Sequence, residues 1–130
     1  MLLPCVMSAE GACLYGRRVE RLRVRGLNIA YERVGQGPPL VLVHGAADDG
    51  RSWHPQLAAM SDDFTVVAWD EPGLGRSSDL PRGFSLEDYA HCLAALVEAV
   101  DLGPAHIYGL SWGGTLTWSS TGSTRRPWRH

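Results

Sequence analysis

Residues 105–113 read Ala105-His106-Ile107-Tyr108-Gly109-Leu110-Ser111-Trp112-Gly113, and they are the most informative part of the chain. The first four residues are a mainly apolar run and predict a short buried strand. Gly109 and Gly113 then flank Ser111, and small residues at these two positions let a strand turn at once into a helix that passes close by. The stretch therefore predicts a strand, a sharp turn with Ser111 at its tip, and a helix.

The chain before this unit predicts four further strands. The first two form a hairpin, because Gly26 and Asn28 tolerate the backbone of a turn. The other two are continuous apolar runs, typical of strands that are buried on both faces. In chain order these strands are expected at residues 19–24, 29–34, 40–43 and 64–69.

Two helices are expected between the later strands. The first is short and falls within residues 53–60. The second begins after Ser85, which has capping-box-like spacing to Asp88, and carries apolar residues at helical spacing up to Val100. Gly103-Pro104 then ends it. A hairpin followed by a parallel β-α-β-α-β run predicts the α/β class, with a mostly parallel sheet and helices on both faces.

The composition describes a globular domain. Its net charge of −2 and its 45% hydrophobic content argue against a nucleic-acid-binding or disordered chain. No apolar run is long enough to span a bilayer, and the first residues lack the pattern of a signal peptide, so we expect a cytoplasmic protein without a membrane partner. The cysteines lack metal or redox spacing, and neither a metal site nor a cofactor is expected: Cys5, Cys13 and Cys92.

Ser111 is the candidate nucleophile, and an incidental serine in a glycine-rich turn is the alternative interpretation. The backbone N–H of Trp112 lies at a helix start, where the helix dipole favours negative charge, and is a candidate oxyanion donor. His44, Gly45 and Ala46 directly follow the strand at 40–43. The N–H of Ala46 is the candidate second donor. We expect His44 to order this loop and not to act as a base.

A third motif, Asp70–Ser77, follows the strand at 64–69 and reads D-E-P-G-L-G-R-S. Its glycines allow a sharp turn beside the candidate site. The motif lacks the G-K-[S/T] ending of a phosphate-binding loop. We expect Asp70 to support the fold, with Arg76 as its ion-pair partner.

These three motifs together resemble those of the α/β-hydrolase superfamily over residues 19–116. His44-Gly45 matches its H-G motif, Asp70–Ser77 its D-x-x-G-x-G-x-S loop, and Gly109–Gly113 its G-x-S-x-G nucleophile elbow. The resemblance implies an acyl-enzyme on Ser111, a small-molecule ester, amide or C–C bond substrate, release by water and no cofactor. A serine at the elbow argues against the haloalkane dehalogenase and epoxide hydrolase branches, which place an aspartate there.

The sequence departs from the family pattern after the elbow. In the family an acid and then a histidine follow the serine. Here no Asp or Glu follows Asp101, and the only histidine after Ser111 is His130. No triad acid or base is therefore assigned in this chain. Beyond Leu116 the residues are poor helix formers, so we expect the helical pattern to be lost.

We therefore divide the chain into three parts and interpret it as a truncated, inactive copy of a hydrolase. Residues 1–18 are expected to be a loose extension, 19–117 a partial α/β-hydrolase domain and 118–130 an aberrant, disordered tail. A frameshift explains such a tail, because Trp118–Gly122 can be encoded by bases that give Leu-Glu-Leu-Tyr-Arg when read one position earlier.

Two further hypotheses remain open at this stage. The fold as predicted leaves an open sheet edge beyond the strand at 105–108, where an unpaired strand favours self-association. A non-catalytic binding or regulatory fragment would dock this edge on a strand of a partner. Alternatively, a separate chain would supply the missing acid and base by complementation.

Overall fold

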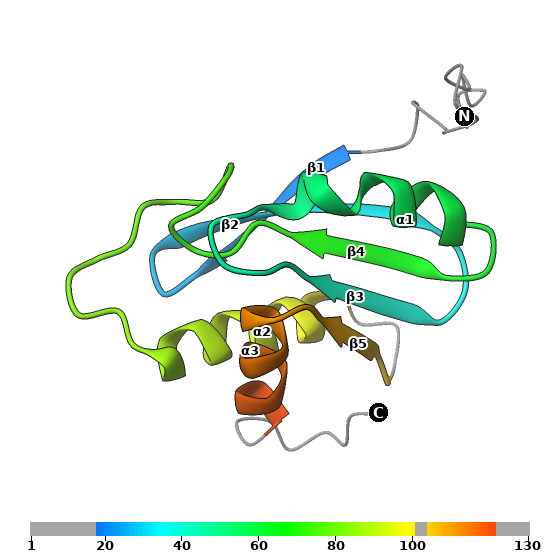
Figure 1. Cartoon of the computed structure of the whole chain (residues 1–130). Helices are drawn as coiled ribbons and strands as arrows, with labels where there is room; N and C mark the ends of the chain where they lie inside the picture. Colours follow the sequence, from blue (N-terminus) through cyan, green and yellow to red (C-terminus); the bar gives the residue numbers. More distant parts are fainter. Residues whose placement is uncertain (1–17, 101–103, 122–130) are drawn as a thin grey trace.

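The computed structural model describes residues 18–100 and 104–121. A single five-stranded sheet runs through this part of the chain in the order β1-β2-β4-β3-β5 (Figure 1). β1 and β2 are antiparallel, as are β2 and β4, whereas β3 is parallel to both β4 and β5. The strands are β1 (Arg18–Val24), β2 (Leu27–Gly35), β3 (Pro39–Val43), β4 (Thr65–Trp69) and β5 (His106–Gly109).

The predicted turn between β1 and β2 is confirmed, but it is shorter than predicted. Arg25 and Gly26 alone connect the strands, with φ angles of 49° and 83°. Two consecutive residues in the left-handed region are typical of the tight hairpin turns that match the twist of the strands. Asn28 therefore lies within β2 and not in the turn.

The two apolar runs form the centre of the sheet, as predicted. All five residues of β3 and all five of β4 are buried. Helices cover both faces, since α1 lies on one side and α2 and α3 lie on the other (Figure 1). Their bounds are α1 (His54–Met60), preceded by a 3₁₀ turn (Gly50–Trp53), α2 (Leu86–Val100) and α3 (Trp112–Thr121). This is the α/β arrangement that the sequence predicts, but the sheet is mixed, because β2 pairs antiparallel with both of its neighbours.

Alternate residues of the central strands pack against different helices. One face joins Leu42 and Val66 to Leu57 of α1. The other face joins Val43 to both α2 and α3 in a larger cluster, which includes Val41, Val67, Trp69, Leu93, Leu96, Val97 and Leu116. Burial on both faces explains why β3 and β4 read as continuous apolar runs.

The start of α2 has the predicted capping box. The backbone N–H of Asp88 donates to Ser85 Oγ at 3.3 Å, and the backbone N–H of Ser85 donates to Asp88 Oδ2 at 2.8 Å. These two bonds satisfy donors that the first turn of a helix leaves without partners. The helix ends at Val100, and Gly103 of the predicted terminator lies outside the described residues.

α3 corrects the expectation that the helix pattern is lost after Leu116, because it continues to Thr121. Hydroxyl groups bond back to the preceding turn: Thr117 Oγ1 donates to the carbonyl of Gly113, and Ser120 Oγ to that of Thr117, both at 2.8 Å. Leu116 and Ser120 are fully buried. Packing of these buried residues outweighs the poor intrinsic propensity of the segment, and the back-bonds satisfy hydroxyl groups that would otherwise lack partners.

The expectation of a disordered tail over residues 118–130 is wrong for 118–121, which belong to α3, and that of a loose extension over 1–18 is wrong for Arg18, which begins β1. The rest of both segments, residues 122–130 and 1–17, lies outside the described residues. Among the helices that are described, none combines the length and the apolar character needed to cross a membrane.

Candidate active site

The three motifs meet at one edge of the sheet. Each follows the carboxyl end of a strand in the parallel part: His44 follows β3, Asp70 follows β4, and Leu110 follows β5. The register pairs Val43 with Gly109, so β3 and β5 end side by side. In open α/β sheets, sites form outside the carboxyl ends of the strands. The position of the motifs therefore fits a functional site.

Ser111 occupies the sharp turn between β5 and α3. Its φ angle is +55°, and the residue is exposed. A non-glycine residue in this left-handed region costs about 1–2 kcal/mol, so the surrounding structure must hold it there. The N–H of Leu110 donates to the carbonyl of Val43 at 3.0 Å, and the N–H of Gly113 donates to the carbonyl of Leu110 at 2.9 Å. These bonds fix the turn on both sides of Ser111.

The glycines on either side of the turn are required by close packing. A Cβ atom at Gly109 would collide with the carbonyl of Gly113 and lie 2.6 Å from Thr117 Oγ1. A Cβ atom at Gly113 would collide with the carbonyl of Val43 and lie 2.6 Å from that of His44. The first turn of α3 therefore passes directly against β3, which gives the physical reason for the G-x-S-x-G spacing.

His44 holds the loop after β3 and is fully buried. Its Nε2 atom accepts a hydrogen bond of 3.0 Å from the N–H of Glu71. Because a backbone N–H only donates, the ring proton must sit on Nδ1, which donates to the carbonyl of Gly45 at 2.8 Å. Both ring nitrogens are thus used in a neutral ring. This arrangement fits the expected ordering role and leaves no nitrogen free to act as a base.

The loop that carries Ala46 lies against the elbow. A Cβ atom at Gly45 would lie 3.5 Å from the carbonyl oxygen of Leu110 and 3.8 Å from Ser111 Cβ, which are ordinary contact distances. Ala46 itself is exposed. Within residues 18–100 and 104–121, the N–H groups of Ala46 and Trp112 donate to no protein acceptor. The two predicted oxyanion donors are therefore both unused, on segments that touch beside Ser111.

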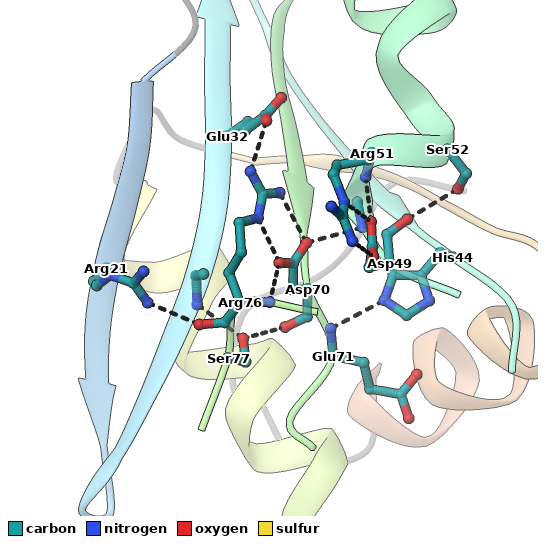
Figure 2. Close-up of polar contacts among 12 residues, drawn as sticks. Arg21, Glu32, His44, Asp49, Arg51, Ser52, Asp70, Glu71, Arg76 and Ser77 are labelled. Carbon is teal, nitrogen blue, oxygen red and sulfur yellow. Dashed lines mark hydrogen bonds and ion pairs between the residues drawn. The ribbon is translucent and has the colours of Figure 1, made fainter. Parts of the chain in front are cut away.

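Asp70 and Arg76 form the predicted ion pair, with Arg76 Nε 2.7 Å from Asp70 Oδ2 (Figure 2). Asp70 is fully buried and also accepts from the N–H groups of Gly50 at 2.9 Å and Arg76 at 2.7 Å. Burial acts to raise the pKa of Asp70, but the hydrogen bonds from Arg76 and Gly50 hold it below the usual range. Asp70 thus remains ionised, and its hydrogen bonds hold the loop after β4 in place.

Sequence reasoning missed the second partner of Arg76. Its Nη1 atom lies 2.8 Å from Glu32 Oε1 on β2, so one guanidinium bridges two buried carboxylates (Figure 2). His54 Nε2 lies 3.0 Å from Glu32 Oε2. Glu32 and Arg76 are 44 positions apart, and no local pattern in the sequence connects them. This cluster explains how the loop after β4 is attached to the hairpin.

Sequence reasoning also did not single out Glu71, which is buried beside the elbow. Its carboxylate oxygen Oε1 accepts a 2.7 Å hydrogen bond from the indole Nε1–H of Trp112. Burial raises the pKa of Glu71, although the hydrogen bond from the indole of Trp112 acts to lower it. Its position directly after Asp70, at the carboxyl end of β4, is the signal that could have found it.

The described residues offer no group of three or more His, Cys, Asp or Glu side chains suited to holding a metal ion. Cys92 is buried on α2, and burial raises the pKa of its thiol to about 11. A thiol is a nucleophile or metal ligand only as a thiolate, so Cys92 is inert at neutral pH.

Residues 38–120 match the family model described as "alpha/beta hydrolase fold". The chain belongs to the α/β-hydrolase family. The "(E)-2-((N-methylformamido)methylene)succinate hydrolase" of Acinetobacter baylyi is 33% identical over 87 residues, which are 67% of this chain and 33% of that protein. This chain spans about a third of the length of the curated hydrolase-family relatives that it matches.

Solved α/β-hydrolase structures resemble this chain in their fold. An N-acyl homoserine lactonase, AidH, complexed with N-butanoyl homoserine has a TM-score of 0.75 and 28% identity, over 82% of this chain and 40% of that chain. "Epoxide hydrolase CorEH without ligand" has a TM-score of 0.78 and 28% identity, over 84% and 38%. Because these relatives carry different activities in their names, the matches show the family and leave the reaction and the substrate open.

Proposed function

We propose that Ser111 is the nucleophile of a serine hydrolase and is acylated by a small ester, amide or C–C bond substrate. The observation that carries the proposal is the left-handed, exposed Ser111 between β5 and α3, with a φ angle of +55°. Such a strained turn presents the hydroxyl group at the carboxyl edge of the sheet. A glycine or asparagine would adopt this backbone more easily, so a serine here points to chemistry.

The unused N–H groups of Ala46 and Trp112 are the proposed oxyanion hole. When Ser111 attacks an acyl carbon, the carbonyl oxygen gains negative charge, and two N–H donors stabilise it. Trp112 is the first residue of α3, where the helix dipole adds to this stabilisation. The contact of Gly45 with the turn brings the two donor segments to the same side of the sheet.

We further propose that the 130-residue chain, as it stands, carries the nucleophile and the oxyanion donors without a triad base or acid. Both nitrogens of His44 are occupied, and no Asp or Glu follows Asp101 in the sequence. In subtilisin, loss of the triad histidine lowers turnover about 10⁶-fold. The chain alone is therefore expected to show no measurable turnover.

Chemical rescue tests this proposal, because imidazole in solution replaces a missing histidine side chain. The purified chain is treated with a fluorophosphonate probe at increasing imidazole concentrations, and modified peptides are mapped by mass spectrometry. We expect no modification of Ser111 in plain buffer and modification that increases with imidazole. Ser111→Ala should abolish it, whereas Ser52→Ala, which removes an exposed hydroxyl outside the site, should not.

Each result has a separate meaning. Modification of Ser111 in plain buffer would contradict the proposed lack of a base. Folded protein that stays unmodified at high imidazole would contradict the role of Ser111 as nucleophile, and circular dichroism shows whether the sample is folded.

A second candidate function is binding through the open edge at β5. The observation that favours it is the exposure of large apolar side chains in this region, 54% for Tyr108 and 51% for Leu110. An edge strand with apolar neighbours can add a strand from a second copy or from a partner. A stable complex in a pull-down that survives Ser111→Ala would support this function over the catalytic one.

A further inference from the structure

Glu71 connects the two segments that carry the proposed oxyanion donors. Its backbone N–H donates to His44 Nε2 at 3.0 Å, on the loop that leads to Ala46. Its carboxylate accepts from the indole of Trp112 at 2.7 Å, on the first residue of α3. Figure 2 shows the Glu71 N–H directed at the His44 ring and the carboxylate lying apart from the Asp70–Arg76 pair. Glu71 thus contacts both segments: it donates a hydrogen bond to one and accepts a hydrogen bond from the other.

This double contact bears on catalysis because an oxyanion hole depends on the relative position of its two donors. The donors come from loops that are far apart in the sequence, and a displacement of either one weakens both hydrogen bonds to the developing charge. The indole of Trp112 packs against the larger hydrophobic cluster and lies edge-on to Tyr89, with a centroid distance of 6.1 Å. The bond to Glu71 adds a directional contact at the indole N–H, which fixes how the ring is oriented within this packing.

We propose that Glu71 is a positioning residue of the oxyanion hole: it holds the His44 loop and Trp112 in register through its backbone N–H and its carboxyl group. This inference rests on the proposed role of Ser111 as nucleophile. Glu71 does not touch the substrate and acts through its two partners.

Burial raises the pKa of this carboxyl group. Its second oxygen, Oε2, is buried and has no hydrogen-bond partner among the described residues. The groups that face it are the indole of Trp112, the neutral ring of His44 and the phenol of Tyr89, none of which is a cation. Glutamine has the same shape, is neutral and keeps the oxygen that accepts the indole bond. Glu71→Gln is therefore the conservative variant, and Glu71→Leu removes the acceptor.

Two measurements on the 130-residue chain separate the hydrogen bond between Glu71 and Trp112 from the reactivity of Ser111. The indole N–H signals of ¹⁵N-labelled protein are recorded by NMR, and Trp112 is assigned by its loss in Trp112→Phe. The rate of imidazole-dependent fluorophosphonate modification of Ser111 is measured on the same variants. Glu98→Leu, a change of an exposed glutamate on α2, is the matched control and should leave both readouts unchanged.

In Glu71→Leu the indole signal of Trp112 should move upfield, as expected for loss of its acceptor. The modification rate should fall about tenfold, which corresponds to the loss of one buried hydrogen bond. Glu71→Gln should restore both readouts. Because Glu71 acts through Trp112, adding Glu71→Leu to Trp112→Phe should not slow modification further.

The proposal would be overturned by an indole signal that does not move in Glu71→Leu. It would also fail if Glu71→Gln were as slow as Glu71→Leu, or if the effect of Glu71→Leu persisted in Trp112→Phe. If the folded wild-type chain is not modified even with imidazole, the role of Ser111 fails instead, and the indole signal still decides whether Glu71 holds Trp112.

Discussion

Replacement of Gly113 by alanine tests how closely the elbow helix packs on the sheet. The new Cβ atom would collide with the carbonyl of Val43 and lie 2.6 Å from that of His44. Both neighbours are backbone atoms of a central strand or its end, so they cannot rotate away as a side chain would. Overpacking of this kind costs about 1–3 kcal/mol, against a gain of up to about 1 kcal/mol from replacing glycine within a helix.

Gly114→Ala is the matched control, because Gly114 is the next residue of the same helix. Its new Cβ atom would lie 3.5 Å from the carbonyl of Gly109, an ordinary contact. Only the gain in helix propensity then remains, up to about 1 kcal/mol. Gly113→Ala should therefore unfold at lower urea concentration than wild type and Gly114→Ala at higher, with free energies of unfolding that differ by the overpacking cost, about 1–3 kcal/mol. Equal stability of the two variants would refute the packing argument.

Three further predictions follow from buried and edge residues. Because the pKa of Asp70 is lowered in the folded state, the stability that it contributes is present above the usual carboxyl pKa and is lost as pH falls through the folded value. Asp70→Asn should therefore lower the free energy of unfolding by about 3 kcal/mol at pH 7, as measured in urea. The variant should also lose less stability than wild type as the pH falls. An unchanged pH profile would contradict this. Iodoacetamide should modify Cys92 much more slowly in the native chain than in urea, as followed by peptide mass spectrometry, and equal rates would exclude its burial. Leu110→Lys should weaken any concentration-dependent self-association in sedimentation experiments, and an unaffected association would place the contact away from the β5 edge.

The fold could be predicted from the sequence where local pattern and tertiary burial agree. Leu40–Val43 and Val66–Trp69 are apolar throughout because strands in the middle of the sheet are covered on both faces. Ser85 and Asp88 mark a helix start because both partners of the capping box lie within one turn. These signals are local, so they can be read without knowing what packs on them.

The end of α3 could not be predicted in this way. Thr117 and Ser120 are poor helix formers in isolation, but in the structure their hydroxyl groups bond to the preceding turn and Ser120 is buried. Intrinsic propensity is a weak signal that packing overrides.

The geometry around Ser111 could be predicted where its residues belong to short motifs, but the contacts between residues far apart in the sequence could not. Ser111 and Gly113 follow from the spacing of the elbow. The contacts Glu71–Trp112 and Glu32–Arg76 join residues 41 and 44 positions apart, and only the fold brings each pair together. Charged residues at strand ends are too common for their partners to be read from the sequence.

The central proposal is that Ser111 is a nucleophile held ready on its elbow, and that the 130 residues alone do not supply the base that activates it. The most direct test is the modification of Ser111 by a fluorophosphonate, measured with and without imidazole by mass spectrometry. We predict no modification in plain buffer, and modification that grows with imidazole and disappears in Ser111→Ala. Folded protein that remains unmodified at every imidazole concentration would contradict the claim.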